Sequence, residues 1–78
     1  MTVDYFSKIK KIIEAKFGVE THEIKHDSYF QDDLNMSELE ITELLTDLEE
    51  ELHVELIEDK GNIESINDLL EILAEKLE

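Results

Sequence analysis

Hydrophobic side chains follow a helical period in three segments of the chain. In the first, residues 4–17, apolar positions recur at steps of three and four: Phe6, Ile9, Ile13 and Phe17. Gly18 follows the last of them, and glycine is the usual residue just after a helix because it adopts the left-handed conformation without strain. We therefore predict a helix over residues 4–17 that ends at Gly18.

The second periodic segment covers residues 38–52. Its apolar stripe, with two further leucines beside it, consists of Ile41, Leu45, Leu48, Leu52, Leu39 and Leu44. Ser37 stands directly before this segment and Glu40 follows it by three residues, which is the pattern of a capping box. We expect the Ser37 hydroxyl to accept a hydrogen bond from the Glu40 amide, and the Glu40 carboxylate to accept one from the Ser37 amide.

The third segment begins at Ser65, with Asp68 three residues later as a second cap pattern. It carries the most regular apolar stripe in the chain: Ile66, Leu69, Leu70, Leu73 and Leu77. The sequence contains no internal repeat and no strand-like alternation of useful length. We predict an all-α fold in which residues 1–78 form one small bundle of three main helices.

Two connecting segments lack the helical period. The first, residues 19–37, carries irregularly spaced apolar residues that we expect to lie against the core: Val19, Ile24, Tyr29, Phe30 and Leu34. The second, residues 53–62, contains a turn signal at 59–62. The sequence does not decide whether this connector also forms a short fourth helix.

The composition is strongly acidic and restricts the classes of function. The chain has 7 lysines, no arginine and 22 acidic residues, which gives a formal net charge of −15. Such a surface does not suit nucleic acid or an anionic membrane, and the apolar runs are too short to span a bilayer. Cysteine is absent, so disulfides and thiolate zinc sites are excluded. The lack of cysteine and of long apolar runs leads us to expect the cytoplasm as the compartment. Because 41% of residues are hydrophobic and periodically spaced, we expect a folded domain.

The acidic residues are not evenly distributed. Four of the seven lysines lie in residues 4–17, whereas the stretch from His26 to Asp59 contains no lysine and thirteen acidic residues. Charge of one sign concentrated in this way attracts a partner of the opposite sign. We therefore predict a docking surface for basic proteins, centred on Glu43, Asp47, Glu49 and Glu50.

The histidines and acidic residues do not form a recognisable catalytic or metal motif. His22, His26 and His53 lie in the connecting segments, without the serine and carboxylate of a triad. The residues from Asp33 onward do not match the EF-hand loop pattern, because Glu38 occupies the glycine position and Leu44 the closing glutamate position. We expect no enzyme activity and no specific metal site.

The central part of the chain resembles the acyl carrier proteins. Residues 30–39 read FQDDLNMSEL, and the family pattern is F-x-x-D-L-G-x-D-S-L. The family's later E-L and L-E-E-E-F correspond to residues 43–44 and 48–52. Residues 9–13 and 17–19 resemble the family's V-K-K-I-I and L-G-V, and the register holds without a gap as far as Leu56.

The resemblance implies a four-helix bundle that carries acyl chains, as in fatty-acid and polyketide synthesis. The chain would be held as a thioester on a 4′-phosphopantetheine arm attached to the serine of D-S-L. It also implies that basic patches of partner enzymes bind the acidic second helix. By this resemblance we expect a monomer whose docking residues are Leu39, Glu40, Glu43, Asp47, Glu49 and Glu50.

The chain departs from the family pattern at the attachment position. Gapless alignment places Ser37 at the family's aspartate and Glu38 at the modified serine. A carboxylate cannot form the phosphodiester that holds the arm. Moving the arm to Ser37 would turn its direction by about 100° around the helix, or take it off the helix, since one turn contains about 3.6 residues.

Two interpretations follow. In the favoured one, Ser37 is a helix cap, Glu38 is either an ordinary first-turn carboxylate or a mimic of the modified serine's negative charge, and no cofactor is bound. The protein would then be a carrier-protein homologue that serves as an acidic docking module. In the alternative, it is a working acyl carrier with 4′-phosphopantetheine on the displaced Ser37.

Overall fold

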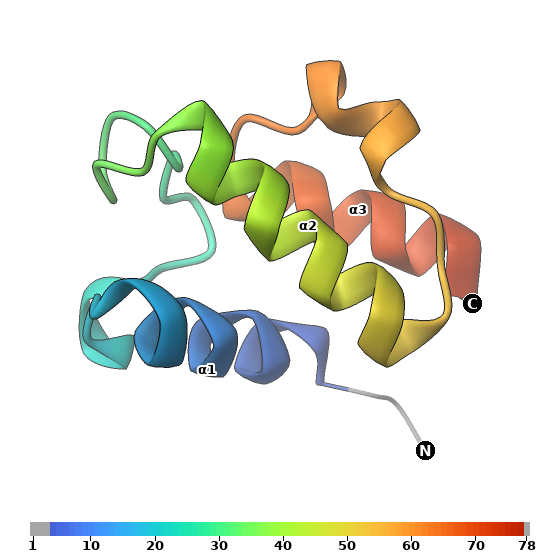
Figure 1. Cartoon of the computed structure of the whole chain (residues 1–78). Coiled ribbons are helices and arrows are strands. Elements are labelled where there is room, and N and C mark those ends of the chain that lie inside the picture. Colours follow the sequence, from blue (N-terminus) through green and yellow to red (C-terminus); the bar gives the residue numbers. More distant parts are fainter. Residues whose placement is uncertain (1–3, 78) are drawn as a thin grey trace.

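The computed structural model describes residues 4–77 and is helical, as the sequence predicts. The elements, in chain order, are α1 (Tyr5–Phe17), η1 (Thr21–Glu23), α2 (Glu38–Leu52), η2 (Ile57–Asn62) and α3 (Ile66–Leu77). In Figure 1, α2 crosses the molecule diagonally, with α1 below it and α3 behind it. The second connector does form a short helix: η2 is a 3₁₀ helix above α2. No helix within residues 4–77 is long and apolar enough to cross a bilayer.

The helix ends lie where the sequence predicts them. The Asp4 carboxylate accepts a hydrogen bond from the Ser7 amide at 3.1 Å and so caps α1. Gly18 ends this helix in the left-handed conformation with φ of 72°, as the sequence predicts. At the start of α3, the Asp68 amide donates to the Ser65 hydroxyl and the Asp68 carboxylate accepts from the Ser65 amide, each at 3.2 Å. Local side-chain chemistry therefore sets where these helices begin and end.

The apolar stripes of the three α-helices meet in one core. Its fully buried large side chains are Phe30, Ile9, Ile13, Leu44, Leu45, Leu48, Leu56, Ile66, Leu69 and Leu73. These come from every α-helix and from both connecting segments, so the connectors are part of the folded unit. Each buried side chain of this size contributes roughly 1.5–3 kcal/mol relative to exposure.

The first connecting segment is joined to the start of α3. The Phe30 amide donates to the Glu64 carbonyl at 3.0 Å, and the Ile66 amide donates to the Ser28 carbonyl at 2.9 Å. Phe30 is fully buried, as expected, but Tyr29 is 48% exposed, so the prediction that it lies against the core is wrong. In an extended bridge successive side chains point to opposite faces, and Phe30 takes the inner one.

Candidate functional site

The start of α2 has the reciprocal hydrogen bonds of a capping box. The Ser37 hydroxyl accepts from the Glu40 amide at 3.2 Å, and the Glu40 carboxylate accepts from the Ser37 amide at 2.9 Å. Ser37 itself has an extended backbone and lies outside the helix. Its predicted role as a cap is confirmed, and Glu40, which the sequence also assigned to docking, is half-buried and held in this box.

The chain approaches α2 through a left-handed residue. Asn35 has φ of 54°, a conformation that asparagine tolerates better than most residues, and it stands where the carrier pattern has glycine. The next residue, Met36, is buried in the core and fixes the path of the chain. Glu38 is then the first helical residue of α2, and its side chain faces solvent at the helix start.

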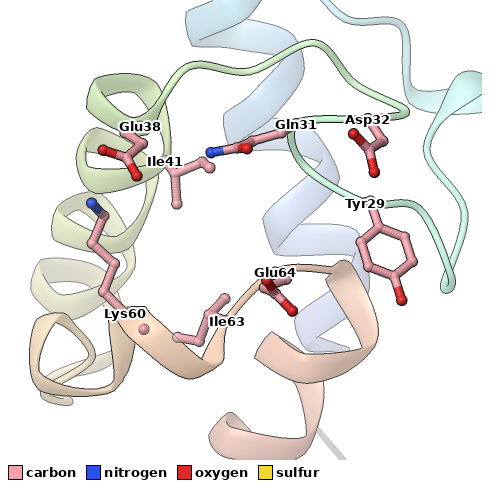
Figure 2. Close-up of a pocket in the computed structure, with 9 residues that line it drawn as sticks. Tyr29, Gln31, Asp32, Glu38, Ile41, Lys60, Ile63 and Glu64 are labelled. Carbon is pink, nitrogen blue, oxygen red and sulfur yellow. The ribbon is translucent and has the colours of Figure 1, made fainter.

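Glu38 also borders a pocket of about 420 Å³. Its other lining residues are Tyr29, Gln31, Asp32, Ile41, Lys60, Gly61, Ile63 and Glu64. Figure 2 shows the apolar side chain of Ile41 between Glu38 and Gln31, that of Ile63 below it, and polar groups around both. The pocket therefore lies between the start of α2, the first connector and η2, directly beside the position that carries the family's serine.

Sequence reasoning did not identify Lys60 as a residue of this site. In Figure 2 its amine extends from η2 toward the Glu38 carboxylate. No ion pair between the two is formed among the contacts of residues 4–77, so Lys60 places a cation near Glu38 without neutralising it by direct contact. No sequence motif relates the two residues, because they come from different elements.

Glu49, predicted as a docking residue, holds the second connector through hydrogen bonds. Its carboxylate accepts hydrogen bonds from the Leu56 amide at 2.7 Å and the Ile57 amide at 3.0 Å. These two bonds lower the pKa of Glu49 below its ordinary value. Leu56 is fully buried, so the contact fixes the chain where it enters the core. Glu49 is therefore a structural residue at the C-terminal end of α2.

Asp47, another predicted docking residue, forms an ion pair with α1. Its carboxylate lies 3.0 Å from the amine of Lys16. The hydrogen bond to Asp47, together with the nearby charges of Asp47, Glu43 and Glu50, raises the pKa of Lys16. Lys16 is thus a counter-ion within the acidic region, which the sequence pattern did not indicate.

The remaining predicted docking residues face solvent together. Leu39 is 68% exposed, and Glu43 and Glu50 are exposed as well. At 100° per residue, positions 39, 43 and 50 fall within about 40° of one another around α2. They form one exposed column, hereafter the α2 column, defined as Leu39, Glu43 and Glu50.

The histidines do not assemble a site. His22 and His26 are exposed, as expected, and the His26 ring lies 3.9 Å from the Phe6 ring. Among the described residues, no group of three or more His, Asp and Glu side chains is placed to hold a metal ion.

Comparison with known proteins identifies the family. The chain is 40% identical to an acyl carrier protein of Clostridium perfringens over 74 residues, which cover 94% of this chain and 97% of that protein. It is 36% identical to acyl carrier proteins of Trieres chinensis, over 94% of this chain and 92% of the relative, and of Pseudomonas aeruginosa, over 92% of each. The chain belongs to the acyl carrier protein family. No family model matches it.

The residues at the start of α2 do not fit the attachment of an acyl carrier arm at the usual position. Glu38 offers a carboxylate where a hydroxyl would have to form the phosphodiester. The hydroxyl of the preceding residue, Ser37, accepts the hydrogen bond that caps α2. Asp32, Glu38 and Glu64 surround the adjacent pocket, with Lys60 as its cation, so an added phosphate would meet mostly like charge.

Proposed function

We propose that this protein is an acyl-carrier-protein homologue that lacks the attachment serine and docks basic partner proteins through the α2 column. The observation that carries the proposal is Glu38 at the first position of α2, beside a Ser37 hydroxyl engaged in the capping box. Such a protein would bind no cofactor and catalyse no reaction of its own. It would act in the cytoplasm, as a monomer, on the enzymes that bind acyl carriers.

The α2 column has the chemistry that such docking requires. Leu39 supplies exposed apolar area, and the carboxylates of Glu43 and Glu50 supply charge about 10 Å apart along the helix axis. A partner with two lysines or arginines at that spacing and an apolar contact beside them would be complementary. The exposed Glu38 adds negative charge at the same end of α2.

A second candidate function is that of a working carrier in fatty-acid or polyketide-type synthesis, with 4′-phosphopantetheine on Ser37. Two observations favour it. Ser37 is exposed, and its hydroxyl lies one residue from the family position. The pocket beside Glu38 also contains apolar side chains, those of Ile41 and Ile63.

Enzymatic modification distinguishes the two functions. The protein is incubated with coenzyme A and a promiscuous phosphopantetheinyl transferase, and the intact mass is recorded, with the Clostridium perfringens relative as the positive control. We expect no mass gain for the wild type and a gain of one arm for Glu38→Ser. The same variant without coenzyme A is the blank.

A mass gain in the wild type would contradict the favoured function, and Ser37→Asp would then locate the arm. This variant removes the hydroxyl but keeps a side-chain acceptor for the cap, so lost modification would not reflect a frayed helix. If Glu38→Ser remained unmodified while the relative was modified, the assignment of Glu38 to the attachment position would be wrong.

A further inference from the structure

The acidic face of α2 is partly neutralised from within the protein. Lys16 reaches from α1 to Asp47 at 3.0 Å, and it remains 42% exposed. Around α2, Asp47 lies about 40° from Glu43 and 60° from Glu50, on the side of the column that faces α1. A lysine or arginine that bound Asp47 from outside would compete with Lys16 for this carboxylate.

We propose that Lys16 is an intramolecular competitor of basic partners, which withholds Asp47 from docking and restricts the binding surface to the α2 column. This inference rests on the proposed docking function and specifies its surface. The partner is a protein segment with two basic side chains spaced for Glu43 and Glu50 and an apolar side chain for Leu39.

The electrostatics of Lys16 support the competitor role. Asp47, Glu43 and Glu50 all attract its ammonium group, so Lys16 stays protonated at neutral pH. Its positive charge weakens the negative potential around these three carboxylates. Both partners of the ion pair are partly exposed, so the contact exchanges with water and can be displaced. A partner that used Asp47 would compete with this ion pair, whereas one that used Glu43 and Glu50 would not.

The test measures binding of a labelled amphipathic peptide with two arginines about two helical turns apart and leucines between them. Fluorescence anisotropy at low salt gives the affinity. Lys16→Gln is compared with Lys11→Gln, which removes the same charge from an exposed position of α1 that makes no ion pair among the described contacts. Both variants change the net charge equally, so a difference between them reports the position of the lysine.

We expect Lys16→Gln to bind the peptide about two- to fivefold more tightly than Lys11→Gln, the range expected for an exposed ion pair. Asp47→Asn should change the affinity of the wild type little and should cancel the gain in the Lys16→Gln background. Equal affinities for the two lysine variants would overturn the inference. A loss for Asp47→Asn as large as that for Glu43→Gln would overturn it too, because Asp47 would then be available for docking.

Failure of the docking function would give a different result. If the double variant Glu43→Gln, Glu50→Gln bound the peptide as well as the wild type, the α2 column would not be a docking surface at all. The charge-swapped variant Lys16→Asp, Asp47→Lys is the folding control, because it keeps an ion pair between α1 and α2 and the same net charge. It should melt like the wild type but bind the peptide less well, since it places a cation beside the column.

Discussion

At the start and end of α2, neighbouring residues differ in role: one polar side chain makes structural hydrogen bonds, and the next is exposed and free to bind a partner. Glu49 and Glu50 are neighbours in sequence, yet Glu49 accepts two backbone hydrogen bonds and Glu50 faces solvent. Ser37 and Glu38 differ in the same way, since the first caps the helix and the second is exposed at its first turn. Which of these side chains can bind another protein depends on which polar atoms the fold leaves without an internal hydrogen bond.

The cap at Ser37 gives a prediction for stability. Ser37→Ala removes the acceptor of the Glu40 amide and should lower the free energy of unfolding by about 1 kcal/mol. Ser37→Asp supplies a carboxylate acceptor next to the positive end of the helix dipole and should stay near the wild type. Urea denaturation followed by circular dichroism measures both. Equal losses for the two variants would mean that the missing hydrogen-bond acceptor is not the cause of the loss.

Glu49 gives a prediction for pH dependence. Because its pKa is lowered from 4.5 in the folded state, the unfolded chain takes up the proton first as the pH falls. Its stabilising contribution is therefore complete at neutral pH and is lost as the pH falls through 4.5 and on to the lower pKa of the folded state. Glu49→Gln should lower the free energy of unfolding by about 1 kcal/mol at pH 7, and this loss should become smaller toward pH 3.

Glu50→Gln is the matched control for that series. It removes the same charge one residue away, from a carboxylate without a hydrogen bond or ion pair among the described contacts. Its free energy of unfolding should differ little from that of the wild type at pH 7 and pH 3. At pH 7 the variant should be slightly more stable, because removing one carboxylate weakens repulsion among the acidic side chains. A pH-independent cost for Glu49→Gln would show that shape, rather than charge, matters there.

Among the elements, α2 combines an N-terminus well suited to carboxylates with a C-terminus that opposes them. Glu38 and Glu40 lie in the first turn, where the helix dipole favours negative charge. The last turn carries acidic side chains and no basic residue, and it ends at His53 in the left-handed conformation. Lys16 from α1 supplies a positive charge to Asp47 of α2. The Leu56 and Ile57 amides donate hydrogen bonds to the Glu49 carboxylate in the last turn.

The two glycines give a prediction about how elements end. Neither Gly18 nor Gly61 has an atom within 4 Å of an added Cβ, so substitution by alanine meets no steric obstacle at either site. Gly18 has φ of 72°, however, which strains an L-residue, so Gly18→Ala should destabilise the protein by about 1 kcal/mol. Gly61→Ala should be neutral or stabilising by less than 1 kcal/mol. Thermal melts that ranked them in the opposite order would refute this assignment.

The molecule as a whole places a charge of −15 on a body with a radius of gyration of 11.3 Å. The screening length is about 10 Å at 0.1 M salt, so below that concentration most acidic groups repel one another across the protein. Lys16–Asp47 and Lys76–Asp59 are ion pairs of the described chain that join different elements. They pair two of the acidic side chains and leave the net charge unchanged.

Salt should therefore stabilise the fold. We expect Tm to rise by several degrees on addition of moderate NaCl or millimolar MgCl₂, because screening and counter-ion binding weaken self-repulsion. The double variant Glu43→Gln, Glu50→Gln is the control, and its increase should be smaller than that of the wild type. A Tm indifferent to both salts would show that repulsion is not a significant cost to folding.

Much of the fold could be predicted because its causes are local. The helical periods and their caps at Asp4, Ser37, Ser65 and Gly18 lie within a few residues of the ends they set, so each boundary was predicted to within about one residue. The exposure of Tyr29 could not be predicted, since it depends on the pairing of the first connector with residues 64–66.

The candidate site could be predicted only in part. The sequence identified Ser37 as a cap, Glu38 as the altered position and Leu39, Glu43 and Glu50 as candidates for docking. The internal hydrogen bond of Glu40 in the capping box was also predicted. The sequence could not show that the fold engages two other docking candidates, Asp47 and Glu49, internally. The carboxylates look alike in sequence, and their partners lie on other turns or other elements.

By itself the sequence determined three helices, a strongly acidic character and a resemblance to the carrier proteins. Side-chain period, capping chemistry and charge are properties of a residue and its near neighbours, so they can be identified without a fold. Only the tertiary structure decided that Lys16 neutralises Asp47, that the Lys60 amine extends toward Glu38 beside a pocket, and which acids remain exposed. Those outcomes depend on where distant segments meet, and burial of the shared apolar core sets that arrangement.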